Sequence, residues 1–254
     1  MKIVACVKQV PDSTTKMKVG ADARSVVTDG ITWSISPYDE YAVELALEHK
    51  DGDPATTVSA VSVGPARAKD ALRAALAMGC DDATLVTGDG VEQATADDIA
   101  AALAGATADL APDLVVCGKQ AADDDQGLVG PALAERLGWP HVALVTKFVA
   151  SAGGVEIWKE VEGGHEVWKA TGPVVLTVQK SAKEPRYPSL PGIMKAKKKE
   201  IPERAFVAGD GPRVEIRKLE PPPQRGAGKI LKDGDPAALA TELVALLRDE
   251  AKVL

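Results

Sequence analysis

The 254-residue sequence has few of the residues that build disulfide, metal or nucleic-acid sites. Its 3 cysteines, Cys6, Cys80 and Cys117, and its 3 histidines are scattered, so neither a disulfide framework nor a zinc site is indicated. Cys6 and Cys117 lie inside apolar runs, where a small buried side chain is the simplest interpretation. A formal net charge of -7 disfavours general nucleic-acid binding, which usually needs a basic surface.

Patterns typical of membrane insertion, secretion and standard phosphate loops are missing as well. No apolar run approaches the roughly 18 residues of a membrane span, so direct membrane insertion is not expected. The start, MKIVACVKQV, has no apolar leader, and we expect a cytoplasmic protein, or a mitochondrial matrix protein if the source is eukaryotic. The absence of GxGxxG, and of GxxxxGK followed by Ser or Thr, excludes a standard dinucleotide or triphosphate site.

Catalytic side-chain constellations are also missing. No serine or cysteine lies in a nucleophile-elbow context, and no histidine is paired with a nucleophile. The acidic pairs Asp81–Asp82 and Asp97–Asp98, and the acids Asp39 and Glu40, lie at expected turns or first helical turns, where capping explains them. We therefore do not expect an enzyme that acts through its own side chains.

The sequence does contain a regular alternation of strands and helices from residue 1 to about 149. Such alternation predicts a doubly wound, mostly parallel sheet of Rossmann-like α/β type, because parallel neighbours need long crossovers. Ser36 is the expected N-cap of the first helix, with Pro37 in its first turn. The expected strands are 2–7, 57–63, 83–86, 114–117 and 141–149, and the expected helices begin at 37 and cover 66–78, 96–110 and 126–137.

After Ala150 the strands follow one another without helices. The ranges 152–159 and 165–169 alternate around EGG and predict a hairpin in which Trp158 faces Trp168. The apolar range 173–178 comes next, again with no intervening helix. We therefore expect these strands to form an antiparallel C-terminal extension or edge of the sheet.

The predicted domain organisation has three parts. Residues 1–180 form the α/β body, and residues 181–230, rich in Pro, Lys and Arg, form a long irregular arm. Residues 231–254 contain a terminal helix that Asp235 caps and whose leucines form one apolar stripe. An irregular segment as long as the arm either is disordered or lies against something outside this chain.

The most informative stretch of the body is VVCGKQAADDDQGLVG, residues 115–130. A buried strand ends at Gly118, a polar loop follows, and a helix is expected to begin near Asp125. The acids of the loop are good helix caps. The loop could instead wrap a nucleotide, because ligands bind beyond the carboxyl ends of parallel strands and helix N-termini attract phosphate. Three adjacent carboxylates would repel a triphosphate, so a monophosphate fits better. Two other strand-end loops, 6–12 and 63–65, could join this site.

The arm begins with EPRYPSLPGIMKAKKK, residues 184–199, in which the prolines are expected to prevent a helix. Three interpretations stay open for its lysines. They form a solvated face, a nucleic-acid arm or a protein-docking element. Aromatic residues do not alternate with the lysines as base stacking would need. For docking, Leu190, Ile193 and Met194 supply an apolar anchor, and the lysines steer toward an acidic partner.

Several motifs in order resemble the beta (small) subunit of the electron transfer flavoprotein. They are KIVACVKQVPD, VVTDGITWSISPYDEYAVELAL, VSVGPARAKDALRAALAMGCDDA, CGKQAADDDQG and EPRYPSLPGIMKAKKK, and they cover nearly the whole chain. The second half, IWKEVEGGHEVWKATGPVVLT, also follows the family pattern except that Trp168 stands where an aliphatic residue is usual.

The resemblance implies an obligate heterodimer with an alpha subunit that holds most of a redox-active FAD. This chain would bind a structural AMP, and residues 231–254 would pack on the alpha subunit. Electrons would come from acyl-CoA dehydrogenases of fatty-acid oxidation, or related donors, and leave to a membrane quinone oxidoreductase. One alternative is an electron-bifurcating relative with a second FAD in place of AMP. A rival class is a non-redox adenine-nucleotide sensor.

The resemblance also implies roles for individual residues. Tyr38 and Ser13 would lie near the FAD. The donor dehydrogenase would dock on Tyr187, Leu190, Pro191, Ile193, Met194 and Lys195. The AMP contacts would be Cys6, Ser36, Pro37, Tyr38, Asp39, Val63, Gly118, Lys119, Gln120, Ala121, Ala122, Asp123, Asp124, Asp125, Gln126, Gly127, Leu128 and Val129.

Overall fold

The computed structural model describes residues 1–254 except 152, 181–182, 208, 210–213, 224–227 and 233. Within these residues a 9-stranded sheet has the order β11-β5-β4-β1-β6-β10-β7-β8-β9, and β2 and β3 form a small second sheet. The large sheet is built from β1 (Lys2–Cys6), β4 (Thr57–Val63), β5 (Asp82–Thr87), β6 (Leu114–Gly118), β7 (His141–Ser151), β8 (Gly154–Val161), β9 (Gly164–Ala170), β10 (Val174–Val178) and β11 (Glu203–Ala205). The small one pairs β2 (Gln9–Pro11) with β3 (Trp33–Ile35).

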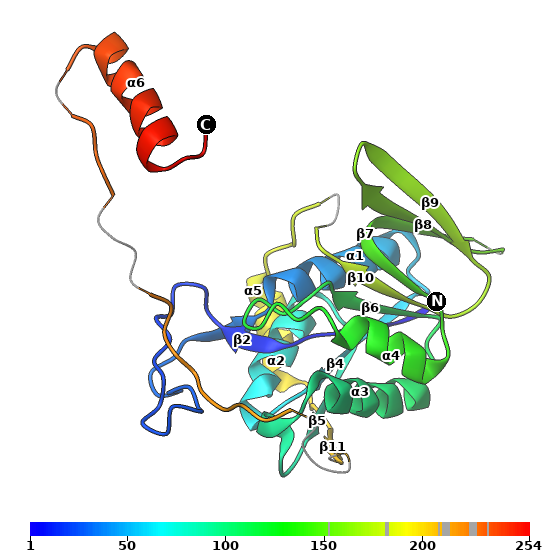
Figure 1. The fold of residues 1–254 in the computed structure, drawn as a ribbon. Helices are drawn as coiled ribbons and strands as arrows, with labels where there is room; N and C mark the ends of the chain where they lie inside the picture. The colour runs from blue at the N-terminus through cyan, green and yellow to red at the C-terminus, as the bar shows by residue number, and fades with distance from the viewer. Residues whose placement is uncertain (152, 181–182, 208, 210–213, 224–227, 233) are drawn as a thin grey trace.

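Helices cover both faces of the large sheet (Figure 1). One face packs against α1, α2 and α5, and the other packs against α3 and α4. Successive β1 residues alternate between the two apolar cores, with Ile3 and Ala5 on the first and Val4 and Cys6 on the second. The helices are α1 (Pro37–Gly52), α2 (Lys69–Met78) after a 3₁₀ turn at Ala66–Ala68, α3 (Ala96–Leu110), α4 (Val129–Leu137), α5 (Leu190–Lys198) and α6 (Pro236–Ala245).

This architecture confirms the predicted α/β fold with a mostly parallel, doubly wound sheet. Strands β11, β5, β4, β1, β6, β10 and β7 are mutually parallel, and β8 and β9 add the predicted antiparallel extension. The helix expected at 96–110 has those bounds, because Thr95 and Asp98 form a capping box at its start. Ala111 follows in a left-handed conformation.

The position of β10 differs from the prediction. An antiparallel or edge strand was expected after the hairpin, but β10 lies between β6 and β7 and is parallel to both. All five of its residues, VVLTV, are buried. A strand that is apolar on both faces is typical of the interior of a parallel sheet, and this composition outweighs the missing helix.

The register of the β8–β9 hairpin also differs from the prediction. Trp158 lies opposite Val167, and Trp168 lies opposite Ile157, so the two tryptophans are on different faces. Val161 pairs with Gly164, which leaves a two-residue turn with Gly163 at a φ of 81°. This turn sets the register, because a shift of one residue moves every side chain to the other face.

The arm contains more regular structure than the prolines predicted. Residues Leu190–Lys198 form helix α5, in which Pro191 lies in the first turn and the Ser189 hydroxyl accepts a hydrogen bond from the Gly192 amide at 3.2 Å. Proline is compatible with a first helical turn because its position needs no amide hydrogen there. Residues 203–205 form β11, which extends the sheet next to β5.

The C-terminal helix α6 is drawn apart from the α/β body in Figure 1. Asp235 caps it as predicted, with one carboxylate oxygen accepting hydrogen bonds from the Ala237 and Ala238 amides. None of the α6 residues is buried, and Leu243 and Val244 are among its exposed apolar side chains. The helix therefore presents its apolar stripe to its surroundings.

Candidate functional site

The predicted strand-end residues meet at one edge of the large sheet. Strands β4, β1 and β6 are parallel neighbours, so their carboxyl ends, Val63, Cys6 and Gly118, lie side by side. Cys6 is in register with Cys117 on the adjacent strand. This edge is where ligands bind in open parallel sheets.

Asp39 links two of these strand ends through its side chain. One carboxylate oxygen accepts a hydrogen bond from the Lys8 amide at 2.7 Å, and the other accepts one from the Gly118 amide at 2.9 Å. Burial raises the pKa of Asp39 to about 7, although these hydrogen bonds favour its charged form. First-turn capping was expected for Asp39, but its partners belong to other elements, so it fixes α1 against β1 and β6.

Gly118 leaves the space that Asp39 needs. A Cβ atom at this position would lie 2.4 Å from the Asp39 Oδ1 atom and 2.8 Å from the Tyr38 Cβ atom. Such distances are well inside van der Waals contact, so a side chain would displace the start of α1. Glycine at the end of β6 is therefore required for the two elements to meet.

Ser36 does not act as the predicted side-chain cap of α1. Its backbone carbonyl accepts the amide hydrogens of Asp39 and Glu40, but its hydroxyl makes no capping hydrogen bond. The residue is 0% exposed, and its Oγ atom has no hydrogen-bond partner within the described part of the chain. A buried hydroxyl without a partner is costly, so this atom is suited to a bound ligand or water.

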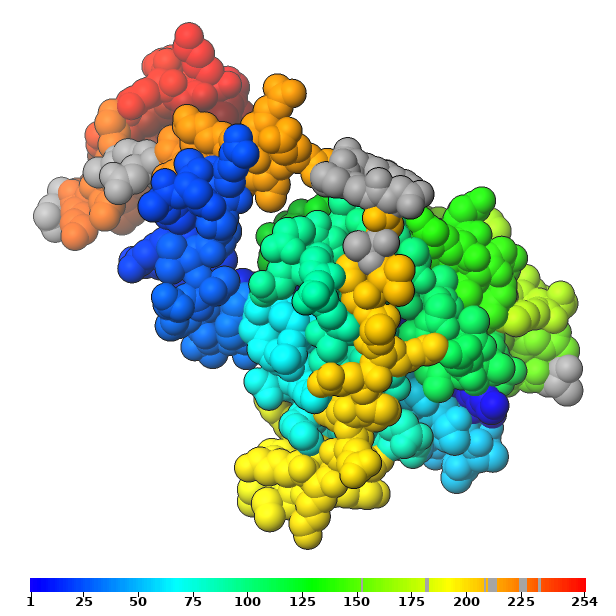
Figure 2. Space-filling view, turned by 90° about the horizontal axis from the view of Figure 1, so that it is seen from below, coloured from blue at the N-terminus to red at the C-terminus, as the bar shows by residue number. Residues whose placement is uncertain are grey.

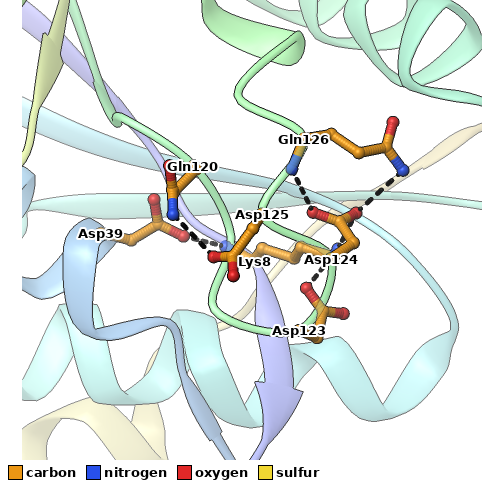
Figure 3. Close-up of polar contacts among 7 residues, drawn as sticks. All are labelled: Lys8, Asp39, Gln120, Asp123, Asp124, Asp125 and Gln126. Carbon is orange, nitrogen blue, oxygen red and sulfur yellow. Dashed lines mark hydrogen bonds and ion pairs between the residues drawn. The ribbon is translucent and has the colours of Figure 1, made fainter. Parts of the chain in front are cut away.

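The loop between β6 and α4 is organised by contacts of its acidic side chains with Lys8, which follows β1, and with loop glutamines (Figure 3). The Lys8 ammonium contacts Asp123 Oδ1 at 2.7 Å and Asp124 Oδ2 at 3.0 Å. Burial alone would lower the pKa of Lys8, but the two ion pairs outweigh it and raise the pKa above its usual value. Asp125 accepts a hydrogen bond from the Gln120 side chain at 2.6 Å. The acids are thus held by Lys8 and by the loop itself.

Helix α4 begins three residues later than predicted, at Val129 rather than Gln126. Asp125 and Gly127 have φ values of 52° and 64°, and these left-handed conformations interrupt the helical path. The three acids consequently do not cap α4, and no other described side chain does so. The first amide groups of α4 are therefore available to an anion, as expected for a phosphate-binding helix start.

Lys8 lies in the loop 6–12 that was predicted to be able to join the site, but it was not among the individual contact residues predicted from the sequence. The available signal was a lysine directly after the first strand, at the same sheet edge as three carboxylates. A surface pocket of about 370 Å³ at the ends of β4 and β5 was also not predicted as a site. Its lining consists of Pro65, Ala66 and Thr87–Gln93. Strand β1 separates β4, at this pocket, from β6, which the acidic loop follows.

The two residues predicted near FAD lie in different segments. Tyr38 is half-buried in the first turn of α1, beside Gly118. Ser13 is exposed in the excursion between β2 and β3. The sequence-based grouping of these residues stays a prediction.

Cys6 and Cys117 have the buried environments that the sequence indicated. All three cysteines are free and buried. A hydrogen bond with the Cys6 thiol, together with burial, raises the pKa of Cys117, and burial raises the pKa of Cys80 to about 12. Thiols with raised pKa values are poor nucleophiles at neutral pH. Within the described ranges no group of histidine, cysteine and acidic residues could hold a metal ion, and no helix is long and apolar enough to cross a membrane.

The residues predicted for docking form an exposed surface, mostly apolar, on α5 and on the residues just before it. We call Tyr187, Leu190, Ile193 and Met194 the docking tip; they are 97%, 79%, 37% and 57% exposed. Pro191 and Lys195 are exposed beside it. Figure 2 shows this part of the chain, in yellow, projecting from the body. The opposite side of α5 packs on α2 through the buried Ala196.

Comparisons with known proteins agree with the motifs. The family model "Electron transfer flavoprotein domain" matches residues 24–208. The "Electron transfer flavoprotein subunit beta" of Bradyrhizobium diazoefficiens is 40% identical over 258 residues, covering 100% of both chains. Its Bacillus subtilis counterpart is 40% identical over 247 residues, covering 94% of this chain and 95% of the relative. The "Electron transfer flavoprotein subunit beta, mitochondrial" of Oryza sativa subsp. japonica is 38% identical over 262 residues, covering 100% of both. The chain therefore belongs to the electron transfer flavoprotein family, among its beta subunits.

Proposed function

We propose that this chain pairs with an alpha subunit that holds most of one FAD, and that it binds AMP at the edge formed by β4, β1 and β6. In this role it carries electrons from acyl-CoA dehydrogenases, or related donors, to a quinone oxidoreductase. It has no catalytic step of its own. The family places the chain in electron transfer, and the nucleotide, donor and acceptor are the parts proposed here.

The buried Ser36 hydroxyl is the observation that carries the AMP proposal. It lies at the start of α1, next to Asp39, which fixes the ends of β1 and β6. A ligand that offers a hydrogen bond there satisfies the hydroxyl, as an adenine or ribose does. The uncapped start of α4 supplies amide groups for one phosphate.

Charge favours AMP over a nucleotide with more phosphates. Asp123, Asp124 and Asp125 bring three negative charges to the loop, and the Lys8 ammonium offsets one of them. The remaining charge is unfavourable to a triphosphate without a metal ion, whereas a monophosphate adds a smaller load. Since the acids are already bonded to Lys8 and to residues of the loop, they shape it and leave phosphate recognition to backbone amides.

The FAD supplies the one- and two-electron chemistry when it is bound, and the protein supplies binding and orientation. On this chain, Tyr38 and Ser13 are the residues proposed to lie near it. The exposed apolar stripe of α6 is suited to packing on the alpha subunit, because an apolar helix face is stabilised by burial. The chain's own part is thus to complete the flavin environment.

The docking tip is proposed to contact the donor dehydrogenase. Exposed apolar side chains that lie together on a surface mark interaction sites, and Leu190 is the most exposed apolar side chain of α5. Lys195, Lys197 and Lys198 are exposed next to it and favour an acidic partner surface. A solvated lysine face does not explain the apolar tip, and a nucleic-acid arm would need aromatic stacking positions.

Analysis of the released cofactors tests the proposal. The chain is produced with its alpha partner, the complex is heat-denatured, and the nucleotides are identified by mass and counted. We expect one FAD and one AMP per heterodimer. Two FAD and no AMP would replace AMP binding by the electron-bifurcating alternative. An adenine nucleotide in a chain that forms no flavin-containing complex would support the non-redox sensor and refute electron transfer.

A further inference from the structure

The docking tip is attached to the body by a partly buried ion pair at its N-terminal side. The Arg186 side chain donates to both carboxylate oxygens of Glu44, from Nε to Oε2 at 2.8 Å and from Nη2 to Oε1 at 2.9 Å. The Arg186 backbone amide donates to the same carboxylate at 3.0 Å. The Glu44 side chain, on α1, is only 5% exposed. Main chain and side chain of Arg186 are therefore both fixed, one residue before Tyr187.

A second acid extends this contact. The Arg186 Nη2 atom also donates to Asp51 Oδ2 at 2.7 Å, near the end of α1. The hydrogen bonds that Arg186 donates to Glu44 outweigh burial and raise the pKa of Arg186, which keeps it charged throughout the accessible pH range. The planar guanidinium uses three of its N–H groups in one arrangement, which a lysine ammonium does not reproduce.

The C-terminal side of the tip is attached independently, to α2 and to the residues that follow it. The Arg73 Nη1 atom donates to the Ala196 carbonyl at 2.8 Å. The Lys199 ammonium donates to the Asp81 carbonyl oxygen. Within α5, a Cβ atom at Gly192 would lie 2.7 Å from the Ala77 carbonyl oxygen, so α5 lies close against α2. The tip is thus an apolar surface held between two anchors.

We propose that Arg186 is a positioning residue that holds the docking tip in one conformation before the partner arrives. Association then needs less ordering of the segment, and this lower ordering cost strengthens binding. The partly buried pair also suits positioning better than stabilisation, since two well-packed apolar side chains would stabilise the same spot at least as well. This inference rests on the proposed docking function and adds a residue that does not touch the partner.

The test uses the assembled alpha–beta complex with Arg186→Gln, Arg186→Lys and Leu190→Ala. Arg136→Gln is the matched control, because Arg136 also forms an arginine–aspartate ion pair, with Asp97 at 2.5 Å on the opposite face. Two quantities are measured: amide hydrogen exchange over residues 187–195 without donor, and steady-state electron transfer from a medium-chain acyl-CoA dehydrogenase supplied with its acyl-CoA.

We expect Arg186→Gln to speed exchange over 187–195 at least tenfold and to raise KM for the dehydrogenase about tenfold. The kcat and the flavin content should stay unchanged. The exchange rate and KM of Arg186→Lys should lie between those of the parent and those of Arg186→Gln. Leu190→Ala should raise KM without changing amide exchange. This result separates direct contact with the dehydrogenase, by Leu190, from positioning of the docking tip, by Arg186. Arg136→Gln should change neither.

Two results distinguish the possible failures. If Leu190→Ala raises KM while Arg186→Gln changes neither exchange nor KM, the positioning role is wrong and docking stands. If neither variant changes KM, the docking function itself is wrong. If Arg186→Gln does not assemble, the exchange rate and KM of Arg186→Lys are compared with those of Leu190→Ala instead. The Lys variant keeps the charge beside Glu44 and loses only the bidentate geometry.

Discussion

Replacing Asp39 by asparagine tests the central contact of the candidate site through the pH dependence of stability. Asp39 has a pKa of about 7 in the folded chain against an ordinary value of 3.8. A raised folded pKa means that the folded state binds more protons than the unfolded state between these values. The free energy of unfolding therefore falls as pH rises from about 4 to 7, and the contribution of Asp39 is fully present only below this window.

The size of the effect follows from the two pKa values. Their difference of about 3 units corresponds to about 4 kcal/mol, at 1.36 kcal/mol per unit. Asparagine does not titrate, so it removes this dependence. Its amide nitrogen must, however, face either the Lys8 or the Gly118 amide, which leaves one backbone donor unpaired at a cost of about 1–3 kcal/mol.

We therefore expect the loss of a hydrogen bond to dominate at low pH and the loss of the Asp39 titration to dominate at high pH. The Asp39→Asn variant should be less stable than the parent near pH 4.5 and gain on it as pH rises, by up to about 4 kcal/mol at pH 8.5. The measurement is the denaturant midpoint of both complexes at each pH, compared pairwise so that other titrating groups cancel.

The control is Asp53→Asn, whose stability difference from the parent should stay nearly constant between pH 4.5 and 8.5, because the titration window of Asp53 lies below its ordinary pKa of 3.8. Hydrogen bonds from Thr56 and the Ala55 amide lower the pKa of Asp53, so its contribution is present at neutral pH and is lost as pH falls through its folded pKa. A stability difference for Asp39→Asn that is flat between pH 4.5 and 8.5, or that favours the parent as pH rises, would refute the buried-carboxylate argument.

Three further substitutions test the site and the tip. Gly118→Ala should destabilise the chain by about 1–3 kcal/mol through overpacking and reduce nucleotide content, whereas Gly105→Ala, in open space on α3, should cost nothing in chemical denaturation. Lys8→Gln should lower stability by less than about 1 kcal/mol, because its ion pairs are partly exposed, and should speed nucleotide release in a stopped-flow chase; an unchanged rate contradicts the loop contact. Leu190→Ala should raise KM for the donor dehydrogenase about tenfold, equal to about 1.4 kcal/mol, with unchanged flavin content; equal KM values refute the anchor.

The sequence was most informative where local chemistry decides the structure. The helix at 96–110 was predicted with its observed bounds, because Thr95, Asp98 and the apolar spacing act within one or two turns. The cap at Asp235 is equally local. The strand-end residues Cys6, Val63 and Gly118 could also be grouped in advance, because parallel strands bring their carboxyl ends to one edge.

The predictions were wrong where a distant contact overrides a local preference. Prolines around α5 argued against a helix, yet packing against α2 and the Ser189 cap stabilise one. The acids at 123–125 looked like caps of α4, but Lys8, more than a hundred residues away, pairs with two of them. Ser36 looked like a cap, and the fold buries its hydroxyl instead.

By itself the sequence determined the alternating α/β body and the family, and it predicted the edge at which a ligand would bind. Each depends on periodicity, or on motifs whose residues are close along the chain. Only the tertiary structure decided that β10 lies inside the sheet, that Asp39 joins β1 to β6, and that Arg186 holds the docking tip on Glu44. Those outcomes depend on which distant groups share a buried space, where desolvation makes pairing obligatory, and a linear pattern does not record that proximity.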